Sequence, residues 1–175
     1  LKIKNGVYDI SISGGAEAPL TQITFGSYCA LSVLSKRNDE PEKASRPFDK
    51  NRDGFVLGEG ASILILEELN HALKRKAKIY AEIVGYAANS GTHHMVIPQP
   101  DGADISSVMR QAIKNANVTI DKVDYINAHG TSTLQNDKVE TAAIKQVFGK
   151  RAYNIPISST KSMTGHSIGA SGAIE

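Results

Sequence analysis

The sequence predicts an α/β protein organised around a mainly parallel sheet. Strand-like and helix-like segments alternate over the second half of the chain, which is the order expected of a parallel sheet with covering helices. Two short apolar segments, residues 123–128 and 155–157, each run into a stretch rich in Gly, Ser and Thr that carries a histidine. Because the carboxyl ends of parallel strands converge on one crevice, we expect these two stretches to lie together.

Composition bounds the kinds of protein that the chain can be. Its 175 residues are 41% hydrophobic, enough for a packed core, and a formal net charge of +2 is too small to indicate a nucleic-acid surface. One cysteine excludes an internal disulfide framework and a cysteine-rich zinc module. No apolar run approaches the roughly 20 residues of a membrane span. The chain begins at Leu1 without Met and ends at Glu175 inside a helical pattern, so we expect a fragment of a longer protein.

The spacing of apolar residues predicts the other elements. Strands are expected over residues 7–13, twice within 55–69 around a glycine bulge, 79–88, and the two apolar segments already given. Helices are expected over residues 19–34, 71–76, 102–117 and a segment that starts near Asn136 and ends at Gly149. The expected N-caps are Asn70, Asp104 and Asn136. Residues 37–54, interrupted by proline and glycine, should form an ordered surface loop.

Three side chains in the histidine-bearing stretches are candidates for chemistry. Lys161 and His166 lie between the second apolar segment and the helix after it, and His129 follows the first segment. Either histidine alone is as readily a core or loop residue, whereas two at neighbouring strand ends make a candidate site. Cys29 lies inside the first expected helix. We expect it to be a small buried apolar residue and not a nucleophile.

Two pairs of residues raise the question of a metal ion. His93 and His94 are adjacent, so their side chains diverge, and no third ligand follows at a useful spacing; a loop role is favoured. Asp137 and Glu140 share one helix face and could hold an ion, although a charge pair at a helix N-terminus is the favoured interpretation. A metal-dependent hydrolase using His93, His94 and His129 is an alternative that metal analysis would decide.

Two long motifs resemble those of one enzyme family. Residues 127–133 read Asn-Ala-His-Gly-Thr-Ser-Thr and continue at 136–140 with Asn-Asp-Lys-Val-Glu; residues 159–166 read Ser-Thr-Lys-Ser-Met-Thr-Gly-His. They resemble the first histidine motif, and the lysine and second histidine motif, of β-ketoacyl-acyl carrier protein synthases, the elongating condensing enzymes of fatty acid synthesis. Further similarity extends over nearly the whole chain, through residues 14–17, 34–39, 45–61 and 78–82. Among the branches of the family, the type II, discrete enzymes are the most similar.

The resemblance implies a fold and a division of the chain. The fold is thiolase-like, with two pseudo-equivalent α/β halves in five αβαβα layers, and it is incomplete in this chain. Residues 1–83 would be the end of the N-terminal half, and residues 84–175 most of the C-terminal half. The family's nucleophilic cysteine would lie upstream of Leu1, and its closing glycine-rich loop after Glu175. The chain by itself should therefore be inactive.

The resemblance also implies a reaction, that of a 3-oxoacyl-[acyl-carrier-protein] synthase. Such an acyltransferase condenses malonyl-ACP, with loss of carbon dioxide, with an acyl chain bound to cysteine. His129 and His166 would donate from ring N–H groups to the thioester oxygen on which negative charge develops. Lys161, held near the histidines and Glu175, would order the hydrogen bonds of the site and favour decarboxylation electrostatically.

The same resemblance suggests how substrate and partners would be bound. Thr131 and Thr133 resemble the hydroxyls that hold the pantetheine arm, and Phe55 resembles an aromatic residue of the acyl pocket, with Tyr28 as a second aromatic candidate. No metal and no cofactor is implied beyond the phosphopantetheine of acyl carrier protein, which is the expected partner. The full-length protein is expected to be a homodimer, with no nucleic-acid or membrane partner, in a bacterial cytoplasm or an organelle matrix or stroma.

The sequence departs from the family pattern at two places near the expected tunnel. Leu134 and Gln135 replace a turn that often contains proline, and Val96 stands where relatives often carry a threonine that contacts pantetheine, so Val96 is not among the expected site residues. Two alternatives stay open: a polyketide-type ketosynthase, and a non-catalytic partner subunit that sets chain length. The presence of both histidines and the lysine argues against the partner subunit.

Overall fold

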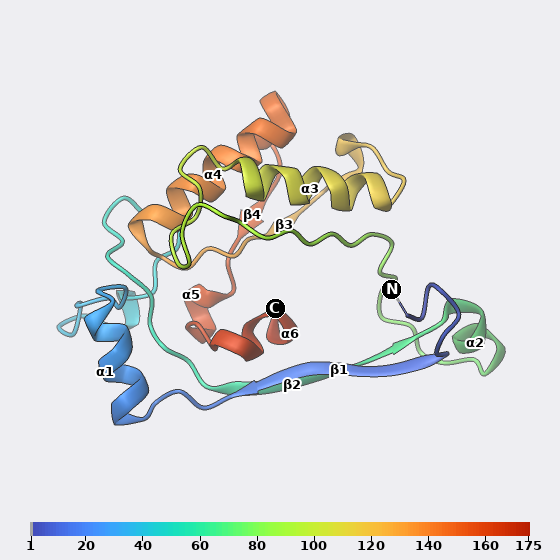
Figure 1. Ribbon diagram of the computed structural model, residues 1–175, viewed down its shortest axis with the longest axis horizontal. Coiled ribbons are helices and arrows are strands. Elements are labelled where there is room, and N and C mark those ends of the chain that lie inside the picture. The colour runs from blue at the N-terminus through green and yellow to red at the C-terminus, as the bar shows by residue number, and fades with distance from the viewer. Residues whose placement is uncertain (1) are drawn as a thin grey trace.

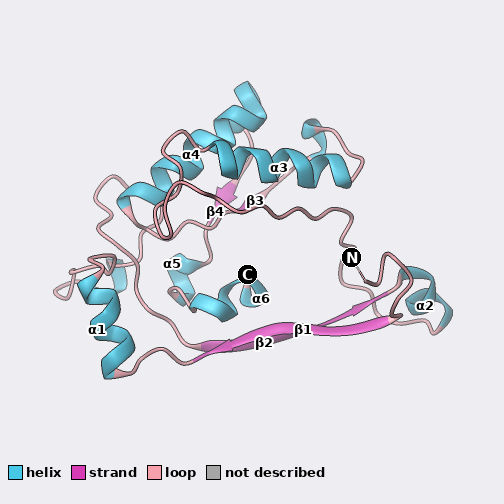
Figure 2. Cartoon of the chain, in the orientation of Figure 1, coloured by secondary structure: helices cyan, strands magenta, loops and turns pink. Residues whose placement is uncertain are grey.

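The computed structural model describes residues 2–175, which alternate between helices and strands (Figure 2). The α-helices are α1 Gln22–Ala30, α2 Leu69–Lys74, α3 Ala103–Asn115, α4 Leu134–Phe148, α5 Lys161–Thr164 and α6 Ser171–Ile174. The strands are β1 Ile10–Glu17, β2 Gly60–Glu67, β3 Ile126–Asn127 and β4 Ile157–Ser158. Four 3₁₀ turns complete the order: η1 Pro41–Lys43, η2 Ile120–Lys122, η3 Gly149–Tyr153 and η4 Ile168–Ala170. Over residues 2–175, no helix has the length and apolar character needed to cross a membrane.

The elements stack in layers (Figure 1). Helices α3 and α4 pack against each other on one side of β3 and β4, while η4 and α6 pack against β1 and β2. The main apolar cluster lies under α4, where Ile144, Val147, Phe148 and Ile155 are all buried. Removal of this apolar surface from water fixes α4 over the two short strands, and therefore fixes the start of α4 beside the end of β3.

Strands β1 and β2 form an antiparallel pair, so the expectation of a mainly parallel sheet is wrong for this part of the chain. The expectation that the first strand stops at residue 13 is also wrong, because β1 continues through Gly14 and Gly15 to Glu17. A Cβ on Gly15 would lie 2.3 Å from the carbonyl oxygen of Gly169, so glycine permits the close packing of η4 on this strand. The two glycines therefore lie inside strand β1 and do not end it.

Strands β3 and β4 form a parallel pair, as the sequence predicts for the segments that carry the two histidine motifs. Ile126 N donates to Pro156 O at 3.1 Å, and Ala128 N donates to Ser158 O at 2.8 Å. The strands are shorter than expected. Within the described residues, 79–88 form no strand, and 55–69 contain one strand, β2, plus isolated parallel bridges at Phe55 and Leu57.

The helices lie close to their expected positions, but their N-caps differ. Glu68 caps α2, Gly102 precedes α3 in a left-handed conformation, and the hydroxyl of Thr133 caps α4, so Asn70, Asp104 and Asn136 are wrong as caps. Each of those three residues lies instead within the first turn of its helix. Helix α1 contains no buried residue, and Cys29 on it is exposed, contrary to the expectation of a buried thiol.

Candidate active site

The two parallel strands bring the two histidine motifs together. Strand β3 leads into the loop of residues 128–133, and β4 leads into α5, so both motifs leave the same edge of the strand pair. Ser159 Oγ donates to Gly130 O at 2.8 Å, which ties one motif directly to the other. A Cβ on Gly130, whose φ is +40°, would lie 2.5 Å from the Ser159 side chain, so this contact requires glycine.

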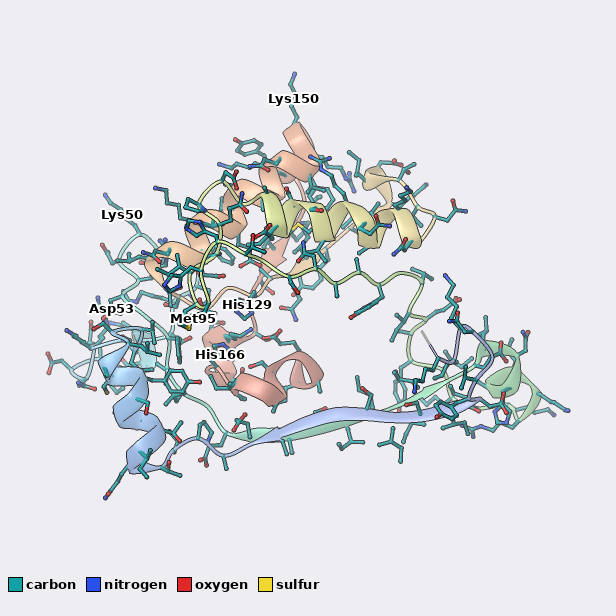
Figure 3. The ribbon with its side chains drawn as sticks, in the orientation of Figure 1. Lys50, Asp53, Met95, His129, Lys150 and His166 are labelled. Carbon is teal, nitrogen blue, oxygen red and sulfur yellow. The ribbon has the colours of Figure 1, made fainter. Side chains whose placement is uncertain are left out.

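The rings of His129 and His166 lie next to each other in an edge-to-face arrangement (Figure 3). Their centroids are 5.5 Å apart and their planes are at 86°. Phe55 packs edge-on against His166 at 5.1 Å, and Tyr28 packs edge-on against Phe55 at 5.6 Å. His166 N donates to Val56 O at 2.7 Å, so the isolated strand segment around Phe55 holds both the backbone and the ring of His166.

Hydrogen bonds assign the neutral tautomer of His166. Ile168 N donates to His166 Nδ1 at 3.1 Å, so Nδ1 is an acceptor and the proton of the neutral ring lies on Nε2. Burial, followed by repulsion from His129 and Lys161, lowers the pKa of His166 to about 4. The pKa of His129 is also lowered; burial of the ring is the largest cause and the nearby charge of Lys161 is the next. Both rings are therefore neutral at pH 7, and His166 has one N–H to donate.

Lys161 is the largest fully buried side chain among the described residues, with 1% of its surface exposed. Its ammonium donates to a carboxylate oxygen of Glu175, and the two residues form an ion pair. Ser45 Oγ donates to the carbonyl oxygen of Lys161 at 2.6 Å. The positive charge of Lys161 is one of the causes that lower the pKa of His129 and of His166.

The carboxylates of Asp137 and Glu140 bind backbone groups. Glu140 Oε1 accepts from His129 N at 2.7 Å and Glu140 Oε2 accepts from Gly130 N at 2.9 Å. Asp137 Oδ2 accepts from Phe48 N at 2.7 Å. These contacts agree with the structural interpretation of the pair. Among residues 2–175 there is no group of three or more His, Cys, Asp or Glu residues arranged to hold a metal ion.

A pocket of about 760 Å³ opens beside the two histidines. Its lining includes five of the expected site residues: Phe55, His129, Thr131, Thr133 and His166. The hydroxyls of Thr131 and Thr133 are 2.9 Å apart. Val96, which was not expected in the site, also lines the pocket, as do His93 and His94. His94 Nδ1 accepts from Val96 N at 3.1 Å, so its ring shapes the turn of this loop.

Two residues that hold the site are not apparent from the sequence. Ser132 is fully buried, with a φ of +69° that is unusual for a residue with a Cβ, and its position between two threonines is the only local signal. Arg52 contacts the same loop from a segment 81 residues earlier in the chain. Lys161 and Glu175 are not lining residues of the pocket; they form an ion pair with each other.

Comparison with known proteins identifies the family. The family model of the beta-ketoacyl synthase C-terminal domain matches residues 80–175, and that of the N-terminal domain matches residues 1–72. A 3-oxoacyl-[acyl-carrier-protein] synthase 2 of Coxiella burnetii is 52% identical over 95% of this chain and 40% of its own length. The protein of the same name from Synechocystis is 53% identical over 99% of this chain and 42% of its own length.

Solved structures of ketosynthases also match the chain. A type II PKS acyl-carrier protein in complex with its ketosynthase, bound to the hexaketide, matches with a TM-score of 0.96 and 46% identity over 99% of this chain and 43% of that chain. A beta-ketoacyl synthase from Burkholderia phymatum matches with a TM-score of 0.92 and 43% identity, over 99% of this chain and 41% of that chain. The fold is therefore that of the ketosynthases, a thiolase-like α/β fold, present here in part.

The chain belongs to the β-ketoacyl synthase family. It spans about two fifths of the length of the relatives that it matches. The resemblance seen in the two histidine motifs is confirmed.

Proposed function

We propose that this chain is the part of a 3-oxoacyl-[acyl-carrier-protein] synthase that stabilises the enolate formed by decarboxylation. The observation that carries the proposal is the pair of adjacent imidazoles, His129 and His166, both with lowered pKa values and both lining one pocket. Neutral donors aimed at one point stabilise a developing oxyanion without reorganisation when charge appears. Relatives that carry this synthase name are 52% and 53% identical to the chain.

In the proposed reaction the C–C bond to the malonyl carboxylate breaks and carbon dioxide leaves. The electron pair passes into an enolate whose oxygen accepts hydrogen bonds from His129 and His166. The enolate carbon then attacks an acyl thioester, a new C–C bond forms, and the cysteine thiolate leaves. The cysteine that carries the acyl group belongs to a part of the enzyme outside this chain. Cys29, on α1, is not among the residues that line the pocket, so we do not assign it as that nucleophile.

The other expected residues have supporting roles. Lys161, paired with Glu175, supplies a positive charge near the histidines, which favours their neutral form and stabilises the negative charge that passes from the carboxylate into the enolate. Thr131 and Thr133 offer two hydroxyls to the amide groups of a pantetheine arm, and Phe55 forms an apolar wall beside His166. The pocket of about 760 Å³ is large enough for an extended arm of this kind.

The whole protein would then be larger than this chain and would work with a partner. We propose that residues 1–83 are the end of the N-terminal thiolase-like half and that residues 84–175 are most of the C-terminal half. The partner is acyl carrier protein, and one structural relative is a ketosynthase in complex with such a protein. We further propose that the enzyme is a homodimer that uses no metal or other cofactor. Relatives named 3-oxoacyl-[acyl-carrier-protein] synthase include a bacterial and a chloroplastic protein, and we propose a bacterial cytoplasm or an organelle matrix or stroma.

A polyketide ketosynthase is the second candidate. A ketosynthase alpha subunit for tetracenomycin from Streptomyces glaucescens is 48% identical over 99% of this chain, close to the 52% of the fatty acid synthase relative. Both candidates perform the same condensation and differ in the acyl chain they extend. A non-catalytic chain-length partner is disfavoured, because the two adjacent histidines and the buried lysine are all present.

Assay of a full-length protein that contains this chain tests the proposal. We expect carbon dioxide release from malonyl-ACP and formation of 3-oxoacyl-ACP when an acyl-ACP is added. A saturated acyl primer should support repeated extension after keto reduction if the pathway is fatty acid synthesis, whereas a polyketide enzyme should extend an unreduced 3-oxoacyl primer. Absence of carbon dioxide release from malonyl-ACP would contradict both candidates, and stoichiometric zinc in the active protein would support the hydrolase alternative.

A further inference from the structure

The loop that carries Thr131 and Thr133 is held by a distant segment, residues 45–54. Arg46 N donates to Ser132 Oγ at 3.1 Å, and Gly54 N donates to Ser132 O at 3.0 Å. Ser132 lies between the two threonines, is fully buried, and has a left-handed backbone that a residue with a Cβ seldom adopts. The conformation of this loop therefore depends on donors that lie elsewhere in the sequence.

Arg52 makes the most extensive side-chain contact between the segment and the loop. Its Nε donates to Thr133 O at 2.9 Å, its Nη2 to Leu134 O at 2.6 Å, and its Nη1 to Asp49 O at 2.9 Å. Its Nε also lies 3.4 Å from a carboxylate oxygen of Asp137, and the exposed fractions of the two side chains are 14% and 1%. A planar guanidinium can satisfy three acceptors in different directions, and an ammonium on a lysine stem cannot do the same.

The peptide group that Arg52 fixes determines where the two threonine hydroxyls lie. Thr133 Oγ1 accepts from Asn136 N at 3.3 Å as the N-cap of α4, and it is 2.9 Å from Thr131 Oγ1. Because this hydroxyl is held to its own helix start, a shift of the Thr133 peptide shifts both hydroxyls together. Both threonines line the pocket beside the histidines.

We propose that Arg52 is a positioning residue for the arm of the substrate. It does not touch the reacting atoms; it holds the peptides of Thr133 and Leu134 so that the hydroxyls of Thr131 and Thr133 meet the amides of a pantetheine chain. The inference rests on the proposed function, since it takes pantetheine as the ligand of these hydroxyls. Arg52 therefore affects the binding of the arm and not the chemistry at the thioester.

Two malonyl thioesters separate these effects in the full-length protein. One is malonyl-pantetheine, and the other is the malonyl half-thioester of ethanethiol, which has no arm. For Arg52→Gln we expect KM for malonyl-pantetheine to rise about tenfold or more with kcat little changed, as when uniform binding is lost. The ethanethiol ester should react at the wild-type rate. Thr133→Val should raise the KM for malonyl-pantetheine by a larger factor in the wild-type background than in the Arg52→Gln background. The effect is smaller in the second case because both changes disturb the same contact.

Lys50→Gln is the matched control. Lys50 lies on the same segment, two residues from Arg52, is exposed, and points away from the site (Figure 3). Lys50→Gln should leave kcat and KM for both thioesters at their wild-type values. If Arg52→Gln loses activity equally with both thioesters, Arg52 affects the whole site and not the arm alone. If it has wild-type kinetics with both thioesters, Arg52 has no role in the site. Either result overturns the proposal. If Arg52→Gln does not fold, Arg52→Lys takes its place and should show the same selectivity.

A binding titration keeps this inference distinct from the proposed reaction. The probe is the amide analogue of acetyl-pantetheine, which binds without reacting. A wild-type protein that binds the probe but does not decarboxylate malonyl-pantetheine would refute the reaction, while weaker binding by Arg52→Gln would still support the role of Arg52. Equal affinity of the wild type and Arg52→Gln, or no binding by the wild type, would overturn that role.

Discussion

Glu140→Gln tests how the first histidine is held. Glu140 is 4% exposed, and its two oxygens accept from His129 N and Gly130 N at 2.7 and 2.9 Å. Glutamine keeps one oxygen as an acceptor, but its NH₂ group faces the second backbone N–H. A hydrogen bond to a charged group contributes about 1.5–3 kcal/mol and an unsatisfied buried donor costs about 1–3 kcal/mol, so we expect a loss of about 2–4 kcal/mol in the free energy of unfolding.

The same change should slow decarboxylation, because the loop that carries His129 loses one of its two anchors. A displacement of about 1 Å in a group that stabilises a transition state can lower the rate about 10²-fold. The measurements are thermal unfolding and carbon dioxide release from malonyl-ACP by the full-length protein. Glu42→Gln, an exposed glutamate on η1, is the control. If Glu140→Gln unfolds at the same temperature and reacts at the same rate as Glu42→Gln, then Glu140 does not hold the loop.

Three further outcomes follow from the site. His129→Ala and His166→Ala should each lower decarboxylation about 10²-fold, as when one preorganised donor is lost, and unchanged rates in both would contradict the oxyanion role. Because the folded-state pKa values of both rings lie below the usual 6.5, with His166 at about 4, the stability that neutral rings contribute is complete above pH 6.5 and is lost as the pH falls toward 4. The decarboxylation rate should therefore stay level down to pH 6.5, and a decline that begins above that pH in a pH profile would count against neutral donors. Lys161→Arg should impair the site although it keeps the charge, since a planar fork does not fit the buried ammonium position; borohydride trapping of a substrate adduct on Lys161 would show that it is a nucleophile instead.

The candidate site could be predicted largely because its chemistry is local in the sequence. His129 and Lys161 each follow directly from a short apolar strand, and parallel pairing of those strands brings them to one edge. The N-cap of α4 could not be predicted, because two nearby residues were both suitable. Thr133 and Asn136 are both good capping residues, and only the extended backbone at Thr133, with a φ of −83° and a ψ of 149°, decides between them.

The contacts that could not be predicted join distant parts of the chain. Nothing near Arg52 in the sequence indicates that its guanidinium binds the carbonyl of Thr133, because loop positions carry no periodicity that relates them. Residues 79–88 have the composition of a strand, but a strand also needs a neighbour for its backbone groups, and pairing is not encoded in the segment. Cys29 lies in a helix that buries no residue, although helical spacing alone would favour a buried face.

The hydrogen bonds from residues 45–54 to the loop of residues 128–133 have a consequence for recombination between relatives. The holding segment lies within the part matched by the N-terminal domain model, and the loop lies within the part matched by the C-terminal domain model. A chimaera joined between residues 72 and 80 would keep both histidine motifs intact, yet it would place a foreign loop against Arg52, Arg46 and Gly54. We therefore expect a chimaera to keep the conformation of the loop of residues 128–133 best when residues 45–54 come from the same parent, although 86 positions separate Arg46 from Ser132.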